Sequence, residues 1–255
     1  MGNLAVKWYG INALEIRHSN GVFMIDPYVS RDDEKIHIPA EVDKYITGKP
    51  DFILMTHAHW DHLPDIPYIL SNFDTVLYAS KTACNIMRAM NVPEAQLHEL
   101  VYGEELLLPG NVKVIALESR HMGIEGEPEG YKTVPENFDF ATKSSWRCGE
   151  TFAFLIEVED KRLLNIGSAN LCERTISGIE CDHLLCGISR WKEGFPELLQ
   201  KNITYSRFIP THHDEFRLKL DDFYLRDDME RLKKAIPGIN YIQMPILQWV
   251  QLDQK

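Results

Sequence analysis

The stretch THAHWDH, residues 56–62, places three histidines and one aspartate within six positions. Such groups are costly to bury, because each imidazole or carboxylate must stay hydrated or find a hydrogen-bond partner. A helix N-terminus capped by Asp61 would explain only one of the four groups. A bound cation would satisfy all four together. The stretch therefore predicts a metal site whose ligands are drawn from His57, His59, Asp61 and His62.

The segment before this stretch, DFILM at 51–55, is apolar and predicts a strand. Thr56 onward then forms the loop at the carboxyl end of that strand, where α/β proteins place their sites. His57 and His59 are two residues apart and can face the same side of an extended loop, while Asp61 and His62 follow. Two ligand pairs can thus point at two neighbouring positions. Neutral imidazole and carboxylate suit zinc, iron or manganese.

Further histidines stand where other predicted strands end. His121 follows the strand-like VKVIALESR, and His212 and His213 lie in RFIPTHHDEF after another apolar run. A hydrolytic metal site needs about three protein ligands per metal and an open position for water. The repeated strand-end placement makes His121 and His212 the expected additional ligands. Four histidines have no such neighbours and stay unassigned: His18, His37, His98 and His183.

Composition narrows the class of protein. The chain has 255 residues, with Lys+Arg 27 against Asp+Glu 38 and a formal charge of -11. This charge argues against nucleic-acid or anionic-membrane surfaces, so a small-molecule substrate is the expected partner. The N-terminal residues do not have a signal-peptide pattern, so we expect no leader. The five cysteines form no CxxC pair, which is typical of reduced thiols in the cytoplasm. We expect one cytoplasmic domain over residues 1–255.

The chain pattern indicates an α/β organisation. Residues 4–27 predict a three-stranded meander, and strand pairs joined by turns predict hairpins over 104–119 and 151–167. Helices are expected within 63–72, 81–90, 168–179 and 195–202, and within 221–236, where Leu225, Met229, Leu232 and Ile236 share one face. Residues 122–146 form a long irregular segment, which we interpret as a lid beside His121.

Four motifs in this order and at these intervals resemble the metallo-β-lactamase superfamily: THAHWDH, then SRH at 119–121, IGSAN at 166–170 and PTHHDEF at 210–216. The similarity covers nearly the whole chain, and the segments FMIDPYVS, with Asp26, and DHLLCGIS also look like segments of that family. Within the superfamily the chain looks closest to the branch that includes ascorbate-6-phosphate lactonase. The resemblance implies a four-layer αβ/βα sandwich, with two mixed sheets, helices outside and a site along one edge.

The resemblance also implies roles for the residues. His57, His59 and His121 would hold a first metal, and Asp61, His62 and His212 a second. His212 is preferred to His213 because it takes the place of the family's first histidine after Pro-x. One departure stands out. Ser168 occupies the position where the family usually has an aspartate that bridges both metals, so the second metal is expected to bind more weakly. The serine hydroxyl is a poor neutral ligand but could hydrogen-bond a bridging water. The missing oxygen of the second metal would then come from one of four nearby groups: Asn170, Glu173, Asp214 or Glu215.

The resemblance implies a hydrolase in which a metal-activated hydroxide attacks an ester, lactone, amide or phosphoester, with Asp61 orienting the nucleophile. One or two divalent ions are expected, zinc first, with manganese or iron as alternatives. Two other functions stay open, namely a mononuclear iron oxidoreductase on the same fold and a metal-binding module without turnover. A homo-oligomer is plausible. Candidate substrate contacts are Tyr28, Lys132, Arg147 and Arg190.

Overall fold

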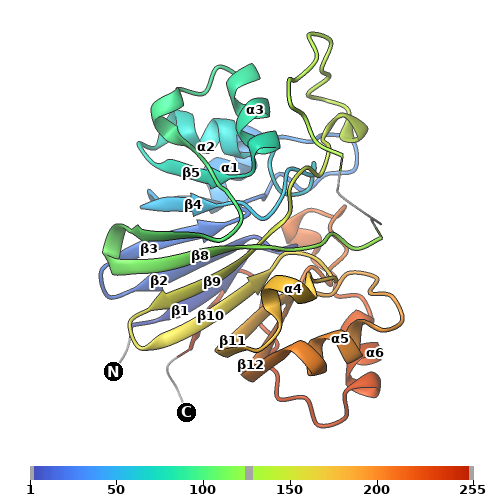
Figure 1. Ribbon diagram of the computed structural model, residues 1–255. Helices are drawn as coiled ribbons and strands as arrows, with labels where there is room; N and C mark the ends of the chain where they lie inside the picture. The colour runs from blue at the N-terminus through green and yellow to red at the C-terminus, as the bar shows by residue number, and fades with distance from the viewer. Residues whose placement is uncertain (1–2, 124–128, 253–255) are drawn as a thin grey trace.

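The computed structural model describes residues 3–123 and 129–252, and its strands form two sheets that face each other (Figure 1). The seven-stranded sheet has the order β13-β1-β2-β3-β4-β5-β6, with bounds Trp249–Gln251 (β13), Ala5–Trp8 (β1), Leu14–His18 (β2), Gly21–Ile25 (β3), Phe52–Leu54 (β4), Val76–Ala79 (β5) and Leu97–Glu99 (β6). The six-stranded sheet has the order β12-β11-β10-β9-β8-β7, with bounds Ile203–Thr211 (β12), Ile179–Gly187 (β11), Lys161–Ile166 (β10), Phe152–Val158 (β9), Val112–Glu118 (β8) and Glu104–Leu108 (β7).

Helices form the two outer layers (Figure 1). The first sheet is covered by α1 (Pro39–Tyr45), α2 (Ile66–Asn72) and α3 (Lys81–Ala89). The second sheet is covered by α4 (Glu173–Ile176), α5 (Phe195–Asn202) and α6 (Asp228–Ala235). Single 3-10 turns occur at Glu94–Gln96, Pro109–Asn111, Lys143–Ser145 and Leu220–Asp222. None of the helices in the described part of the chain has the length and apolar character needed to span a bilayer.

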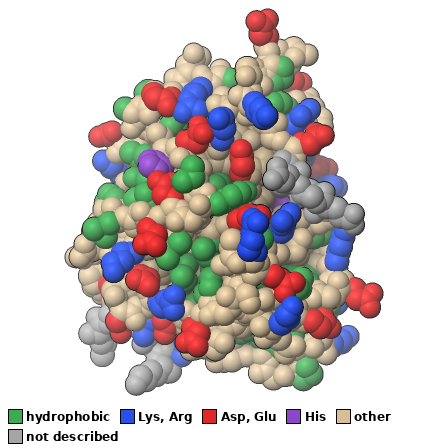
Figure 2. Space-filling view, in the orientation of Figure 1, with side chains coloured by type: hydrophobic (Ala, Val, Ile, Leu, Met, Phe, Trp, Pro, Cys, Tyr) green, Lys and Arg blue, Asp and Glu red, His purple; other side chains and the backbone are tan. Residues whose placement is uncertain are grey.

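The core lies in three apolar layers, because each sheet is buried on both faces over most of its area. Between the sheets, Phe23 stacks on Phe52 at 4.7 Å, and Phe154 of β9 belongs to the same cluster. Ile53 and Leu77 point the other way, toward α2 and α3. An outer part of β7 to β9 lacks a covering helix, and Figure 2 shows hydrophobic side chains gathered over β8 and β9.

Both sheets are mixed, as the expected four-layer sandwich requires. In the first sheet β1, β2 and β3 pair antiparallel, which confirms the meander, while β3, β4, β5 and β6 pair parallel. In the second, the two expected hairpins are β7–β8 and β9–β10, and β10, β11 and β12 pair parallel. Gly110 (φ 78) and Glu159 (φ 56) take the left-handed conformations that these two hairpin turns need.

Two helix predictions were too long. Within 221–236 only Asp228–Ala235 is α-helical among the described elements, and Leu225 instead forms an isolated antiparallel bridge with Asp214. Backbone hydrogen bonds from Glu215 N to Tyr224 O and from Arg226 N to His213 O draw this segment away from a helix. Within 168–179 only Glu173–Ile176 is helical, and Gly178, at φ 80, lies just beyond it. Tertiary pairing overrides helical periodicity in the first case.

Candidate metal centre

The predicted ligands lie in loops that follow the carboxyl ends of strands from both sheets. Asp26 follows β3 and His57 follows β4, and these strands are parallel neighbours. In the second sheet β8, β10 and β12 run in one direction, so His121, Ser168 and His212 emerge at the same edge. This topology explains how residues more than 150 positions apart in sequence come together.

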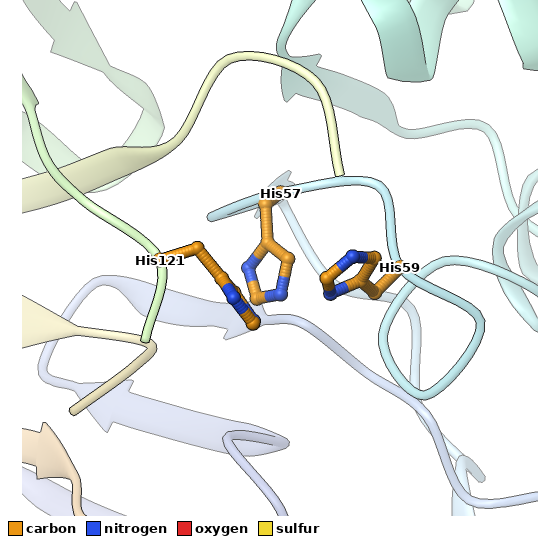
Figure 3. A group of neighbouring side chains, drawn as sticks. All are labelled: His57, His59 and His121. Carbon is orange, nitrogen blue, oxygen red and sulfur yellow. The ribbon is translucent and has the colours of Figure 1, made fainter. Parts of the chain in front are cut away.

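His57, His59 and His121 form the first group. Figure 3 shows their three rings turned toward a common centre, with His57 and His59 on one loop and His121 on the other side. Their ring centroids are 4.5 to 4.9 Å apart, and one nitrogen from each lies within 4.8 Å of the others. Such an arrangement of imidazoles could hold one divalent ion.

Asp61, His62 and His212 form the second group. Asp61 lies between the two imidazoles, with Oδ2 at 3.4 Å from His212 Nε2 and Oδ1 at 4.0 Å from His62 Nε2. A tetrahedral ion with bonds of about 2.0–2.1 Å keeps its ligand atoms about 3.3 Å apart. The observed spacing is therefore close to what an ion at this position would impose.

Hydrogen bonds on the far side of the rings orient the ligand nitrogens. His62 Nδ1 lies 2.8 Å from Asp26 Oδ2, and His121 Nδ1 lies 2.8 Å from the carbonyl oxygen of Met122. In each case the Nδ1–H donates, so Nε2 keeps its lone pair for a metal. Nε2 of His57 and Nε2 of His62 are buried without a hydrogen-bond partner among the described residues. Buried imidazole nitrogens left unpaired in this way fit a bound cation.

Asp26 forms a third possible ligand group with His57 and His62, but both of its oxygens already accept hydrogen bonds. Its Oδ1 accepts the backbone N–H of Thr56 at 2.7 Å, and its Oδ2 accepts the Thr56 hydroxyl, the Asn12 amide and the His62 ring. The family resemblance singled out this residue without a role, and the structure assigns it the role of orienting the ligands.

Burial sets the protonation of the first group. It lowers the pKa of His57 well below the ordinary value, that of His59 to about 4 and that of His121 to about 3. These imidazoles are neutral at pH 7 and available as ligands.

In the second group charge neighbours outweigh burial. Burial alone would raise the pKa of Asp61, but His62 and His212 lower it below the usual range. Burial alone would lower the pKa of His62, but Asp26 and Asp61 raise it above the ordinary value. A negative Asp61 between imidazoles is the charge distribution that a cation stabilises.

Ser168 takes part in holding the first group in place. Its hydroxyl accepts the backbone N–H of Met122 at 3.0 Å, directly after the expected ligand His121. None of the three suggested acidic replacements, Glu173, Asp214 and Glu215, joins a ligand group in the described residues. Asn170 donates to the His121 carbonyl, Glu173 pairs with Lys201, Asp214 pairs with Arg31 and the Glu215 carbonyl accepts from Arg31.

His212 and His213 point in different directions, in agreement with the choice between them. His213 stacks on Trp8 at 5.3 Å, away from the ligand groups, and burial lowers its pKa to about 4. The His212 backbone is left-handed (φ 51), and its N–H donates to the Ile11 carbonyl at 2.6 Å. Arg31, which sequence reasoning missed, forms a fully buried ion pair with Asp214 at 2.7 Å and so fixes this segment. No local sequence signal distinguishes this arginine.

A small pocket of about 180 Å³ opens onto the ligands. Besides His59, Asp61, His121 and His212, it is lined by Trp60, Met122, Ser168, Ser189, Arg190 and Phe216. Of the four candidate substrate contacts only Arg190 lies there. Tyr28 is buried and donates to the Ser30 carbonyl, Lys132 lines another pocket and Arg147 pairs with Glu129.

The expected lid at 122–146 includes residues 124–128, which lie outside the described residues. Beyond them, Phe138 and Trp146 are buried against the outer core of the first sheet. Asn85 of α3 donates to the carbonyl oxygens of Tyr131 and Lys132. This part of the segment is therefore attached to the helical layer, and Met122 is its described contribution to the pocket wall.

Comparison with known proteins gives the family. A family model described as "Beta-lactamase superfamily domain" matches residues 22–212. The chain is similar to proteins called UPF0173 metal-dependent hydrolase. The one from Pyrobaculum arsenaticum is 27% identical over 248 residues, covering 96% of this chain and 97% of the relative. The one from Thermodesulfovibrio yellowstonii is 28% identical over 181 residues, covering 65% and 64%. These relatives do not support the expected likeness to the ascorbate-6-phosphate lactonase branch.

Solved structures share the fold at low sequence identity. Igni18, a metallo hydrolase from Ignicoccus hospitalis, has a TM-score of 0.63 and 15% identity, covering 97% of each chain. Zn(2+)-bound PqqB from Methylobacterium extorquens has a TM-score of 0.57 and 13% identity, covering 94% of this chain and 86% of PqqB. At such identities the likeness concerns the fold alone. Together with the family match, it shows that the chain belongs to the β-lactamase superfamily and has the metallo-β-lactamase fold.

Proposed function

We propose that the protein is a metal-dependent hydrolase that cleaves an ester, lactone, amide or phosphoester bond of a small molecule. The observation that carries this proposal is the convergence of two ligand groups on one pocket, with His57 Nε2 and His62 Nε2 buried and unpaired in the described structure. The relatives named metal-dependent hydrolase support the same class of reaction.

In this proposal His57, His59 and His121 hold one divalent ion, and Asp61, His62 and His212 hold a second. Nitrogen and carboxylate ligands favour zinc, with manganese or iron as alternatives. A divalent ion supplies Lewis acidity and lowers the pKa of bound water toward 7. Asp26 and the Met122 carbonyl keep His62 and His121 in the tautomer that presents Nε2.

Asp61 is the one carboxylate that lines the described pocket. Its pKa lies below the usual range because His62 and His212 outweigh the effect of burial, so it stays ionised at neutral pH. An ionised carboxylate accepts a hydrogen bond from an attacking water and orients it, and its low pKa makes it a weak base. We therefore assign orientation of the nucleophile to Asp61.

A one-metal site is the second candidate, and Ser168 favours it. The Ser168 hydroxyl holds Met122 and brings no negative charge between the two ligand groups. His57, His59 and His121 alone would then bind a single ion, as in a mononuclear iron oxidoreductase or in a binding module without turnover.

The test is metal content per chain by elemental analysis, on protein purified without added metal, for the natural chain, Ser168→Asp and Ser168→Ala. We expect Ser168→Asp to bind the second ion more tightly than the natural chain, because it adds a carboxylate at the pocket. Ser168→Ala separates this gain from loss of the hydroxyl bonded to Met122. Zinc-loaded protein is then assayed against lactones, carboxylic esters, amides and phosphoesters. Bound metal without hydrolysis of any substrate would reject the hydrolase, and bound iron with oxygen consumption would support the oxidoreductase.

A further inference from the structure

Arg190 is a cation placed at the mouth of the candidate metal centre. It lies in the segment after β11 and lines the same pocket as His59, His121 and His212. The other pocket walls are largely apolar or neutral, with Trp60, Met122, Phe216 and two serines. Arg190 is therefore the pocket group that can attract a negative charge on a bound molecule, beside the ligand groups themselves.

The guanidinium of Arg190 has no hydrogen bond or ion pair with any residue that the structure describes. Three other cations of the described chain, by contrast, have acidic partners. Arg226 pairs with Asp228 at 2.6 Å, Arg231 approaches the same carboxylate at 3.6 Å, and Lys143 lies 3.8 Å from Asp33. Asp61, the acid in the pocket, lies between His62 and His212.

The backbone that carries Arg190 is held in a conformation that non-glycine residues seldom adopt. Its φ is 48°, in the left-handed region, which costs conformational energy and persists only where the surroundings impose it. Asp228 imposes it, because its Oδ1 accepts the Arg190 N–H at 2.9 Å. Asp228 is 1% exposed, and the Trp191 indole donates to its carbonyl at 3.3 Å. Because Asp228 holds the Arg190 backbone in this strained conformation beside the pocket, we infer that the position of the Arg190 side chain matters for the site.

We propose that Arg190 binds an oxyanion of the substrate, a carboxylate or a phosphate, so that the protein acts on small anionic molecules. This inference rests on the proposed function and names its substrate class. A guanidinium offers two parallel N–H donors that match the two oxygens of such a group. The small pocket keeps that group within a short distance of the bond to be cleaved. The formal charge of -11 on the whole chain is compatible with anion binding, because the cations at the site decide it.

The test compares Arg190→Gln with Lys192→Gln. Lys192 is an exposed cation two positions away that does not line the pocket, so it is a matched control for the loss of charge. Two pairs of substrates are compared, each with one neutral and one charged member. The first pair is 4-nitrophenyl acetate and the charged mono-4-nitrophenyl succinate. The second pair is dimethyl 4-nitrophenyl phosphate and the charged methyl 4-nitrophenyl phosphate. We expect Arg190→Gln to lower kcat/KM for the charged member at least tenfold more than for the neutral member, mainly through KM. The pair that shows the effect identifies carboxylate or phosphate as the recognised group.

Binding without turnover gives an independent readout. Titration of zinc-loaded protein with succinate and with inorganic phosphate should show at least tenfold weaker binding in Arg190→Gln for the recognised anion, and natural affinity in Lys192→Gln. If Arg190→Gln and Lys192→Gln bound the anions equally well, the inference would be overturned. An equal loss of kcat/KM on the charged and neutral substrates in Arg190→Gln would overturn it as well. If anions bind through Arg190 while no substrate is hydrolysed, the anion site stands and the proposed hydrolase fails. Elemental analysis must give the same zinc content in all variants.

Discussion

Asp26 accepts hydrogen bonds from the Thr56 backbone, the Thr56 hydroxyl, the Asn12 amide and the His62 ring. It is 1% exposed and has a left-handed backbone (φ 44). One carboxylate thus fixes the loop that begins the metal motif and the tautomer of one expected ligand. Such outer partners fix the tautomer and orientation of metal-binding imidazoles and so influence metal affinity.

Asp26→Asn should weaken zinc binding by about 10- to 100-fold, because an amide cannot accept from all four donors and His62 then loses its fixed tautomer. Competition with a chromophoric chelator measures the affinity. The control is Asp51→Asn, which alters a carboxylate that accepts the Val22 N–H at the start of β3, far from the site. Natural zinc affinity in Asp26→Asn would contradict the assignment.

At the scale of secondary structure elements, β10 and β11 approach the metal loop without space for side chains. A Cβ on Gly187 would lie 2.7 Å from the Gly167 carbonyl oxygen, and a Cβ on Gly167 would lie 2.8 Å from the Thr56 Cβ. Both glycines are therefore required by close approach of backbone. This contact sets how near Ser168 and the THAHWDH loop can lie.

Gly167→Ala should lower the free energy of unfolding by about 1–3 kcal/mol, because the added methyl group must push Thr56 away. Urea denaturation followed by circular dichroism measures this change. Gly48→Ala is the matched control, since nothing lies within 4 Å of its Cβ position, and it should change stability by less than about 0.5 kcal/mol. Equal effects of the two substitutions would refute the argument from close packing.

At the scale of the whole molecule, the expected ligands join the two sheets. His57 to His62 belong to the first sheet's loop, and His121 and His212 to the second sheet. Below them, the Asn12 and Asn165 amides form a reciprocal pair, and Thr211 donates to Asn12. At the edge where the site lies, the two sheets are thus also joined by hydrogen bonds between polar side chains.

The metal-free chain should lose stability as the pH falls from about 6.5 to about 4. Burial lowers the folded pKa of His59 to about 4, whereas the unfolded imidazole titrates near 6.5, so the unfolded chain takes up the proton first. The loss from this one group is on the order of 3 kcal/mol. Thermal unfolding with chelator across this pH range measures it. His59→Gln should flatten the dependence, and bound zinc should raise the melting temperature at pH 7.

Much of the fold and of the candidate site could be predicted from local sequence. The meander, the two hairpins and the placement of expected ligands after strands follow from period-two patterns, turn residues and the density of metal-binding groups at 56–62. These features depend on neighbours in sequence. The remaining features depend on contacts between residues that are far apart in the sequence.

The polar partners show why local patterns were insufficient. Arg31 and Asp214 meet across more than 180 residues, and Asn12 and Asn165 across 153. Leu225 fitted a helical face by spacing, yet its segment pairs with 213–215. The sequence offers the Ser168 hydroxyl as a partner for a bridging water. Its observed partner is the Met122 N–H, and this contact depends on how two loops meet.

Because both ligand groups draw on the two sheets, the order of biosynthesis matters. A nascent chain that has emerged only through β7 contains His57, His59, Asp61 and His62 but neither His121 nor His212. It can hold a metal only with an incomplete ligand set and without the second sheet that buries the centre. The last expected ligand, His212, is added only after β12. Capture of an ion by both complete ligand groups would therefore have to follow the synthesis of β12, and a chain truncated before β12 lacks the full second ligand group.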